Sequence, residues 1–265
     1  MNELSLTGHD GHQIADWRSW TRPKAEYHWR AGRSAMELAR AWFTSPVPVC
    51  PPEVESILES HPATAGVAWT EGWPEYVTPL PERGEGRNHD LLLVGCRDGC
   101  GVVVSVEAKV DEPFGERIGD YWLRARESKR RTRAPERIEA LVSMVFGSGT
   151  RPDAKPWSLL RYQLLTAVAG TAIEAAHRKS DTAVLIVHEF ITHSADPAKV
   201  ADNGRDLSDF VSVLFSEGAD PMQPGRLNGP AVLAADKNLP RAVNVFIGKA
   251  VFSWRNNDGP DNPTN

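Results

Sequence analysis

Two apolar runs that flank an Asp-Gly pair constrain this chain more than any other feature of its sequence. The runs lie within residues 88–109, NHDLLLVGCRDGCGVVVSVEAK, and the pair is Asp98-Gly99. Asp-Gly between apolar runs is the strongest short-range signal for a two-residue type I′ turn, because both central residues then take positive φ. The sequence therefore predicts a β-hairpin whose register is set by this turn.

The turn also assigns each strand residue to a face of the hairpin. Leu91 then lies opposite Val106, and Asp90 lies opposite Glu107. Directly opposed residues point to the same face, and alternation brings Lys109 to the face of Asp90 and Glu107. We therefore expect one face in the core and a second face that ends in two carboxylates and an ammonium group. The core face is apolar throughout: Leu91, Leu93, Val102, Val104, Val106 and Ala108.

The predicted pair of carboxylates indicates a metal site. Two opposed carboxylates repel each other unless a cation lies between them. Mg²⁺ prefers oxygen ligands and is commonly held by one or two carboxylates together with water and phosphate oxygens. Lys109 would lie beside such an ion, where it could orient a water molecule or stabilise charge on a phosphate. The alternative is a solvated charge pair between Glu107 and Lys109, an arrangement common at strand ends.

Asp90 followed by Glu107-Ala108-Lys109 at the end of an apolar strand resembles the PD-(D/E)xK nuclease superfamily. His89 stands where the motif has proline. The resemblance implies an α/β restriction-endonuclease-like core, in which a mixed β-sheet is flanked by helices. It also implies that Asp90, Glu107 and the main-chain carbonyl of Ala108 hold Mg²⁺, for which Mn²⁺ substitutes, and that Lys109 assists the attacking water.

The resemblance covers roughly residues 30–190. Within it, GRSAMELARAW, EAKVDEPFGE and RYQLLTAVAGT are similar to blocks of an uncharacterised bacterial family attached to the superfamily. DNA is the substrate and partner that the resemblance implies, while RNA and the strand form of the substrate stay open. Many members cleave both strands as homodimers, and no dimer face is marked in this sequence.

The superfamily often adds a glutamate from the helix that precedes the first core strand, and Glu37 is the matching residue. The sequence predicts this helix over Ala35–Phe43. Ser34 and Glu37 also form a Ser-x-x-Glu capping box, in which Ser34 is the N-cap and Glu37 the N3 residue. Two interpretations of Glu37 therefore stay open: helix capping, and support of the metal ion or its waters.

A second supporting side chain is predicted on the longest helix, residues 156–177. Gln163 lies in the stripe of small and apolar residues on this helix, where its amide needs a partner. Several branches of the superfamily place Gln, Arg or Tyr on the helix after the catalytic strands, and Gln163 is the best match. A satisfied core amide is the alternative. The stripe consists of Leu160, Gln163, Ala167, Gly170 and Glu174.

Residues 117–137 concentrate positive charge in a chain whose formal net charge is -5. Two helices are expected here, over 117–131 and 135–146. Their basic side chains could contact a nucleic-acid backbone, which requires no base recognition. The alternative is a solvated helix face with internal ion pairs, such as Glu127 with Arg131. The residues proposed for backbone contact are Arg124, Lys129, Arg130, Arg131 and Arg133.

The chain is long enough to bury a core as one domain, and we predict three segments. These are a helical N-terminal arm rich in aromatic residues over 1–30, a single domain over 31–255 and a disordered tail over 256–265. The remaining elements are predicted as a helix at 53–60, short strands at 66–70 and 76–79, a buried strand at 182–190, a helix at 206–216, a loop at 218–230 and a strand at 242–254.

The composition is that of an ordinary globular protein, with 41% hydrophobic and 25% charged residues. No apolar run is long enough to span a membrane, and the N-terminus lacks the pattern of a signal peptide. The three cysteines are too few and odd in number for a disulfide framework, which predicts a reducing cytoplasm.

The leading hypothesis is thus a Mg²⁺-dependent nuclease that hydrolyses DNA. The first rival is a module that binds nucleic acid or protein and keeps the fold without hydrolysis. The second rival is a structural charge cluster of Asp90, Glu107 and Lys109 in a protein with another enzymatic site. A large apolar pocket with convergent polar groups elsewhere would favour this second rival.

Overall fold

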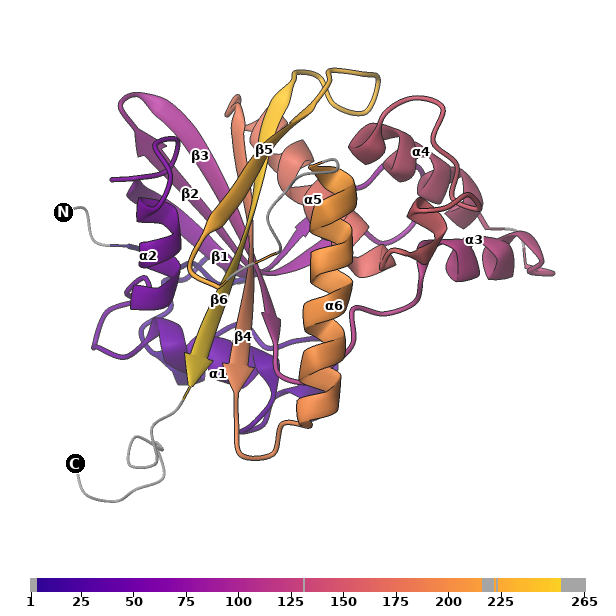
Figure 1. Ribbon diagram of the computed structural model, residues 1–265. Helices are drawn as coiled ribbons and strands as arrows, with labels where there is room; N and C mark the ends of the chain where they lie inside the picture. Colours follow the sequence, from indigo (N-terminus) through magenta and orange to yellow (C-terminus); the bar gives the residue numbers. More distant parts are fainter. Residues whose placement is uncertain (1–3, 131, 216–221, 223, 254–265) are drawn as a thin grey trace.

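The computed structural model describes residues 4–130, 132–215, 222 and 224–253. These residues form the predicted α/β fold, with one mixed β-sheet between two layers of helices (Figure 1). The strands are β1 Ala68–Thr78, β2 Arg87–Arg97, β3 Cys100–Lys109, β4 Thr182–Ile191, β5 Leu227–Leu233 and β6 Val243–Ser253. The α-helices are α1 Ser34–Trp42, α2 Pro52–Glu59, α3 Ile118–Arg126, α4 Ala134–Phe146, α5 Tyr162–His177 and α6 Pro197–Leu214.

The six strands of the sheet lie in the order β1-β2-β3-β4-β6-β5. The centre is parallel, because β4 pairs in parallel with both β3 and β6, whereas the outer pairs are antiparallel. The step from β3 to β4 passes through α3, α4 and α5, the crossover that a parallel pair requires. Residues 182–190 of β4 are all buried, as predicted for a strand covered on both faces.

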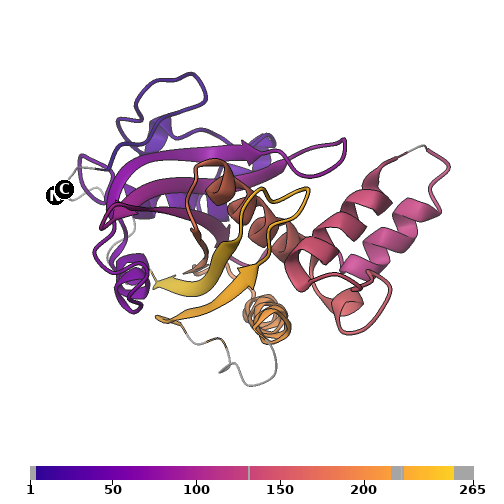
Figure 2. The same ribbon diagram turned by 90° about the horizontal axis from the view of Figure 1, so that it is seen from above.

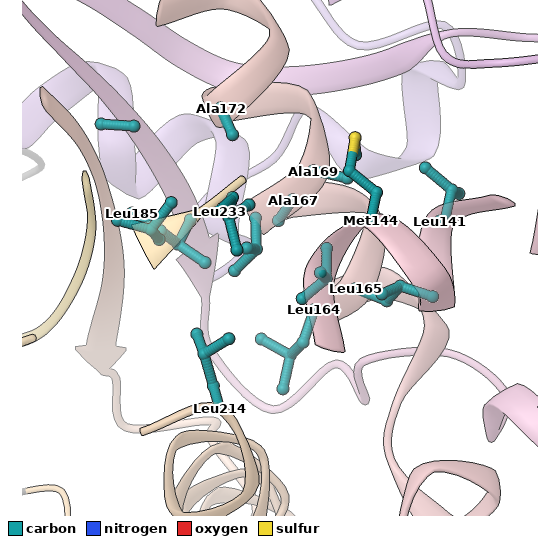
Figure 3. Close-up of a cluster of buried hydrophobic side chains, with 14 of the residues drawn as sticks. Leu141, Met144, Leu164, Leu165, Ala167, Ala169, Ala172, Leu185, Leu214 and Leu233 are labelled. Atoms are coloured by element: carbon teal, nitrogen blue, oxygen red, sulfur yellow. The ribbon is translucent and has the colours of Figure 1, made fainter. Parts of the chain in front are cut away.

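Each face of the sheet has its own hydrophobic core. α1, α2 and the N-terminal segment cover one face, which receives Leu91 and Leu93 of the hairpin. α5 covers the other face together with α4 and α6, and Figure 3 shows the leucine and alanine side chains that pack there. α3 and α4 lie side by side and project beyond the sheet (Figure 2). The hairpin is therefore buried on both faces except near its turn, and Asp90, Glu107 and Lys109 lie at the end away from the turn.

The hairpin has the predicted turn and register. Asp98 and Gly99 have φ of 49° and 81°, as a type I′ turn requires, and Leu91 pairs with Val106. The ladder ends at this pair, so the expected pairing of Asp90 with Glu107 is wrong. The strands separate at the point where two carboxylates would have faced each other, which avoids their repulsion.

The N-terminal segment packs on the body but is not a helical arm, so this prediction is wrong. Within residues 4–30 the structure has two single-turn 3-10 helices, Trp17–Ser19 and Glu26–His28. Leu6 and Trp20 are buried in the core on the α1 side of the sheet. The segment is held by side chains that dock in this core and by backbone hydrogen bonds with Gly72 of β1, and Pro23 would interrupt a longer helix.

Two predicted elements have different bounds. A single strand, β1, replaces the short strands predicted at 66–70 and 76–79, with an irregularity between Trp69 and Glu71. α5 begins at Tyr162 instead of Pro156, because a 3-10 turn is followed by extended backbone at Leu160. This break lets the first turn of α5 approach the end of the hairpin.

The C-terminal third also differs from prediction. α6 begins at Pro197, earlier than expected, because the Asp196 side chain caps the helix by accepting a hydrogen bond from Ala198 N at 2.9 Å. β5 begins inside the predicted loop 218–230 as an edge strand. The predicted tail, 256–265, lies outside the described residues. Within the described part of the chain, no helix combines the length and the apolar character needed to cross a membrane.

Candidate active site

The charged end of the hairpin lies beneath the first half of α5. Ser105 of β3 is hydrogen-bonded to Thr171 of α5, so the face of β3 that carries Ser105, Glu107 and Lys109 points toward this helix. Only 1% of the surface of Glu107 and 5% of that of Lys109 is exposed. Charges buried to this degree need partners, because desolvation would otherwise destabilise them.

Gln163 joins the two motif residues. Its Nε2 donates to Glu107 Oε1 at 2.6 Å, and its Oε1 accepts from Lys109 Nζ at 3.1 Å. Lys109 Nζ also lies 2.8 Å from Glu107 Oε1. The structure thus brings together three of the predicted residues, and the amide of Gln163 is satisfied by Glu107 and Lys109.

Arg87, at the start of β2, is a site residue that the sequence analysis missed. Its guanidinium forms a buried ion pair with Glu107 through Nη2. Its Nε is also buried and has no hydrogen-bond partner among the described residues. The cations that offset the buried carboxylate are therefore Arg87 and Lys109, so a bound metal ion is not required to balance its charge. No local pattern marks Arg87, which follows a polar, Gly-rich loop.

Asp90 is tied to the motif strand through its backbone. Asp90 Oδ2 accepts a hydrogen bond from Ala108 N at 2.7 Å. The N–H and C=O of one strand residue point to the same side, so the Ala108 carbonyl is directed toward the Asp90 side of β3. Burial raises the pKa of Asp90, while the charges of Lys109 and Arg87 oppose that rise. Asp90 and Ala108 thus present oxygen donors at the place where β2 and β3 separate.

Lys109 has an altered acidity in these surroundings. Burial lowers its pKa to about 8, with Asp90 acting in the opposite direction. A lysine of this kind exchanges protons near neutral pH, as a general base or acid must. Its ammonium group also lies 5.0 Å from the ring centroid of Phe114, which limits its orientation.

Glu75 of β1 is a third acidic residue near Asp90 that the sequence analysis missed. Pro74 pairs with Leu91 and Tyr76 with His89, which places Glu75 beside Asp90 in the register. Glu75 has a φ of 53°, unusual for a residue other than glycine. Burial and the charge of Asp90 raise its pKa to about 7. Only the register between β1 and β2 reveals this proximity, and no local signal could have done so.

Glu37 lies elsewhere in the molecule. α1 packs on the opposite face of the sheet from α5, and Glu37 lines a small hollow beside the end of β4. The predicted capping box is wrong, because the N-cap is Arg33 and Ser34 already lies in the helix. Glu37 instead accepts a hydrogen bond from Gly32 N at 2.7 Å and pairs with Arg40. These contacts support a structural role at the start of α1.

A cleft of about 370 Å³ opens beside Asp90 and Gln163. One wall is the 79–86 loop, which Arg137 of α4 holds by donating to the carbonyl oxygens of Pro81, Glu82 and Glu85 at 3.1, 3.1 and 2.6 Å. The lining also contains two tyrosines that meet edge to face. The full lining is Leu80, Glu85, Gly86, Arg87, Asn88, Asp90, Tyr121, Arg137, Tyr162, Gln163 and Thr166.

The predicted basic residues divide into paired and exposed side chains. Arg124 is paired with Glu116 at 2.7 Å, and Arg133 with Glu82 at 2.7 Å. Lys129 and Arg130 are exposed in the connection between α3 and α4, on the pair of helices that projects from the body (Figure 2). Arg131, and with it the predicted Glu127–Arg131 pair, lies outside the described residues. The internal pairing favours the solvated-face interpretation for Arg124 and Arg133.

A larger hollow of about 1070 Å³ lies between the ends of α4 and α6 and strand β5. It is the feature that could favour a second enzymatic site. Among the described residues that line it, Asp236 is the one ionisable side chain, next to apolar residues such as Phe146 and Leu233. It therefore lacks convergent acid and base groups. In the described ranges no cluster of three or more His, Cys, Asp or Glu side chains is placed to hold a metal ion.

Comparison with known proteins identifies a family without assigning an activity. No curated protein and no solved structure matches this chain. One family model does match, over residues 11–252, which covers the described chain except the first residues of the N-terminal segment and the last residue of β6. The chain therefore belongs to the family described as a domain of unknown function, DUF6946.

Proposed function

We propose that this protein is a metal-dependent nuclease that hydrolyses phosphodiester bonds in DNA on a restriction-endonuclease-like core. The observation that carries the proposal is the joint placement of Lys109, Glu107 and Gln163 beside Asp90 at the open end of the hairpin. Side chains far apart in sequence converge there at the edge of a cleft, as in a site built for chemistry.

The oxygen donors of this site fit a hard cation in part. Asp90 and the carbonyl of Ala108 would hold Mg²⁺ or Mn²⁺, and Glu75 adds a nearby carboxylate. Glu107 fits less well, because its oxygens already accept from Arg87, Lys109 and Gln163. When bound, the ion would stabilise charge on the phosphate and acidify a water molecule.

The residues of the chain itself would perform the remaining tasks. Lys109, with its pKa of about 8, is partly unprotonated near neutral pH and could accept a proton from the attacking water. Gln163 contacts both Lys109 and Glu107 and would keep them in position. Arg87 adds positive charge where a phosphate would be bound.

A second candidate function is binding without hydrolysis on the same fold. The closed network around Glu107 favours it, since a carboxylate already compensated by two cations can be purely structural. The two candidates differ in whether the site turns over a substrate.

Cleavage assays test the proposal directly. Plasmid and oligonucleotide substrates are incubated with Mg²⁺ or Mn²⁺, with EDTA as a control, using the wild type, Lys109→Ala, Asp90→Ala and Lys199→Ala. Loss of a catalytic acid or base typically costs about 10²- to 10⁴-fold in rate, so the first two variants should lose cleavage. Lys199, an exposed residue of α6, is the matched control and should retain it.

Two results would contradict the nuclease proposal. One is a wild type that cleaves neither single-stranded nor double-stranded DNA nor RNA, together with calorimetry that detects no Mn²⁺ binding at millimolar concentration. The other is metal-dependent cleavage that persists in both site variants. Circular dichroism of each variant separates loss of activity from loss of folding.

A further inference from the structure

We propose that the cleft beside Asp90 receives an unpaired nucleotide, so that the substrate class of this site is single-stranded DNA. This inference rests on the proposed nuclease function and specifies the form of its substrate. Three features of the site support it: the depth of the charged residues, an unsatisfied buried donor and the aromatic side chains that line the cleft.

The charged residues lie too deep for a duplex to reach them. Arg87, Glu107 and Lys109 expose 8%, 1% and 5% of their surfaces. A double helix is a stiff rod, and a cleft of about 370 Å³ is too small to admit it. Moreover, Arg137 ties the 79–86 wall to α4 through three hydrogen bonds, so this wall is held in place. A single strand can instead bend and insert one nucleotide.

A buried donor in the cleft lacks a partner. Arg87 lines the cleft, and its Nε makes no hydrogen bond to any described residue although the side chain is buried. Buried N–H groups are nearly always satisfied, so an unpaired one indicates a missing acceptor. A phosphate oxygen at the part of the cleft that Arg87 lines suits its guanidinium, because charge-assisted hydrogen bonds from guanidinium to phosphate are strong. Arg87 and Lys109 carry one positive charge more than Glu107, their shared partner, and a phosphodiester group would offset that excess.

The aromatic part of the lining offers a surface for a base. Tyr121 of α3 and Tyr162 of α5 line the cleft, both half-buried, with ring centroids 4.8 Å apart in an edge-to-face arrangement. Aromatic side chains bind unpaired bases by stacking, without strong sequence preference. The guanidinium of Arg124 lies 4.8 Å from the Tyr121 ring and is paired with Glu116, so it supports the ring without a free charge for the strand.

Binding is measured by fluorescence anisotropy with a short labelled single-stranded DNA of mixed sequence and with the same sequence as a blunt duplex, in EDTA and in Ca²⁺. The variants are Tyr121→Ala, Tyr121→Phe and the control Tyr27→Ala. Tyr27 is 69% exposed on the N-terminal segment and does not line the cleft. We expect the wild type to bind the single strand at least about tenfold more tightly than the duplex, and Tyr121→Ala to weaken that binding about tenfold. Tyr121→Phe and Tyr27→Ala should bind like the wild type.

The inference is overturned if the duplex binds as tightly as the single strand, or if Tyr121→Ala binds the single strand as the wild type does. Because binding is read without cleavage, its failure is distinguishable from failure of the proposed function. Tight binding that depends on Tyr121, without hydrolysis under any metal, would retain the inference and reject the nuclease. Rapid duplex cleavage with no preference for single strands would reject the inference and retain the nuclease.

Discussion

At the scale of single residues, a glycine of α5 decides whether Arg87 can reach Glu107. A Cβ added to Gly170 would lie 2.9 Å from both Cβ and Cγ of Arg87 and 3.1 Å from Cε1 of His89. These atoms lie close to the β2 backbone and cannot swing away as the end of a long side chain could. The absence of a side chain at this point of the apolar stripe therefore lets the start of β2 pass beneath the helix.

We predict that Gly170→Ala destabilises the protein by about 1 to 3 kcal/mol, because overpacking in a filled core costs that much and outweighs the helix propensity gained. Gly204→Ala in α6 is the matched control, since the nearest atom to its added Cβ is Lys249 Nζ at 3.9 Å. That variant should be stabilised by up to about 1 kcal/mol. Urea unfolding measures both, and equal effects of the two substitutions would refute the close approach to Arg87.

At the scale of elements, the cleft depends on a clamp between a helix and a loop. Arg137 of α4 is buried and donates to three carbonyl oxygens of the 79–86 loop. Gly84 in the same loop has a φ of 142°, and an added Cβ would lie 2.6 Å from Arg137 Nη2. The loop and α4 therefore pack closely against each other. Because Arg87 and Asp90 follow the loop in the chain, the clamp also fixes where these two residues begin β2.

We predict that Arg137→Met loosens this loop while the rest of the fold persists. Hydrogen exchange of the amides in residues 81–86 should accelerate, and the free energy of unfolding should fall by about 2 to 4 kcal/mol, the sum of three hydrogen bonds of ordinary strength. Arg151→Met is the control, because Arg151 is 71% exposed and pairs only locally with Asp153. Unchanged exchange in 81–86 after Arg137→Met would show that other contacts hold the loop.

At the scale of the whole molecule, two cores on one sheet enclose neutral histidines. Burial lowers the pKa of His188, against the opposing hydrogen bond from its Nε2 to Glu53 at 2.9 Å. Burial also lowers the pKa of His89 well below its ordinary value, and the charge of Arg87 acts in the same direction. The folded protein therefore binds protons at these two rings less readily than the unfolded chain does.

The sign of the resulting pH dependence follows from proton linkage. Below a pH of about 6.5 the unfolded chain takes up a proton at His188 that the folded protein does not, so the free energy of unfolding falls as the pH falls. We predict that His188→Gln removes this pH dependence of the free energy of unfolding, which amounts to up to about 1.4 kcal/mol per pH unit. The substitution should change the free energy of unfolding less above pH 7 than below it. His12→Gln, with the His12 side chain 84% exposed, is the control. Urea unfolding between pH 5 and 8 checks the prediction. Parallel curves of the free energy of unfolding against pH for His188→Gln and the wild type would contradict it.

The sequence by itself determined the features that depend on neighbours in the chain. The turn at Asp98-Gly99 set the register of the hairpin, because a two-residue loop permits only one alignment of its strands. The period of apolar residues predicted α5 and the position of Gln163 on its inner face. The long apolar run of β4 predicted a strand buried on both faces.

Only the tertiary structure decided how distant segments meet. Glu75 lies beside Asp90 because of the register between β1 and β2, and Arg87 pairs with Glu107 because the strands separate and Gly170 leaves room. Glu37 is remote from Asp90 because α1 packs on the opposite face of the sheet. These placements depend on the free energy of burying several charges at once. That free energy is a sum over long-range contacts, and no local pattern in the sequence contains it.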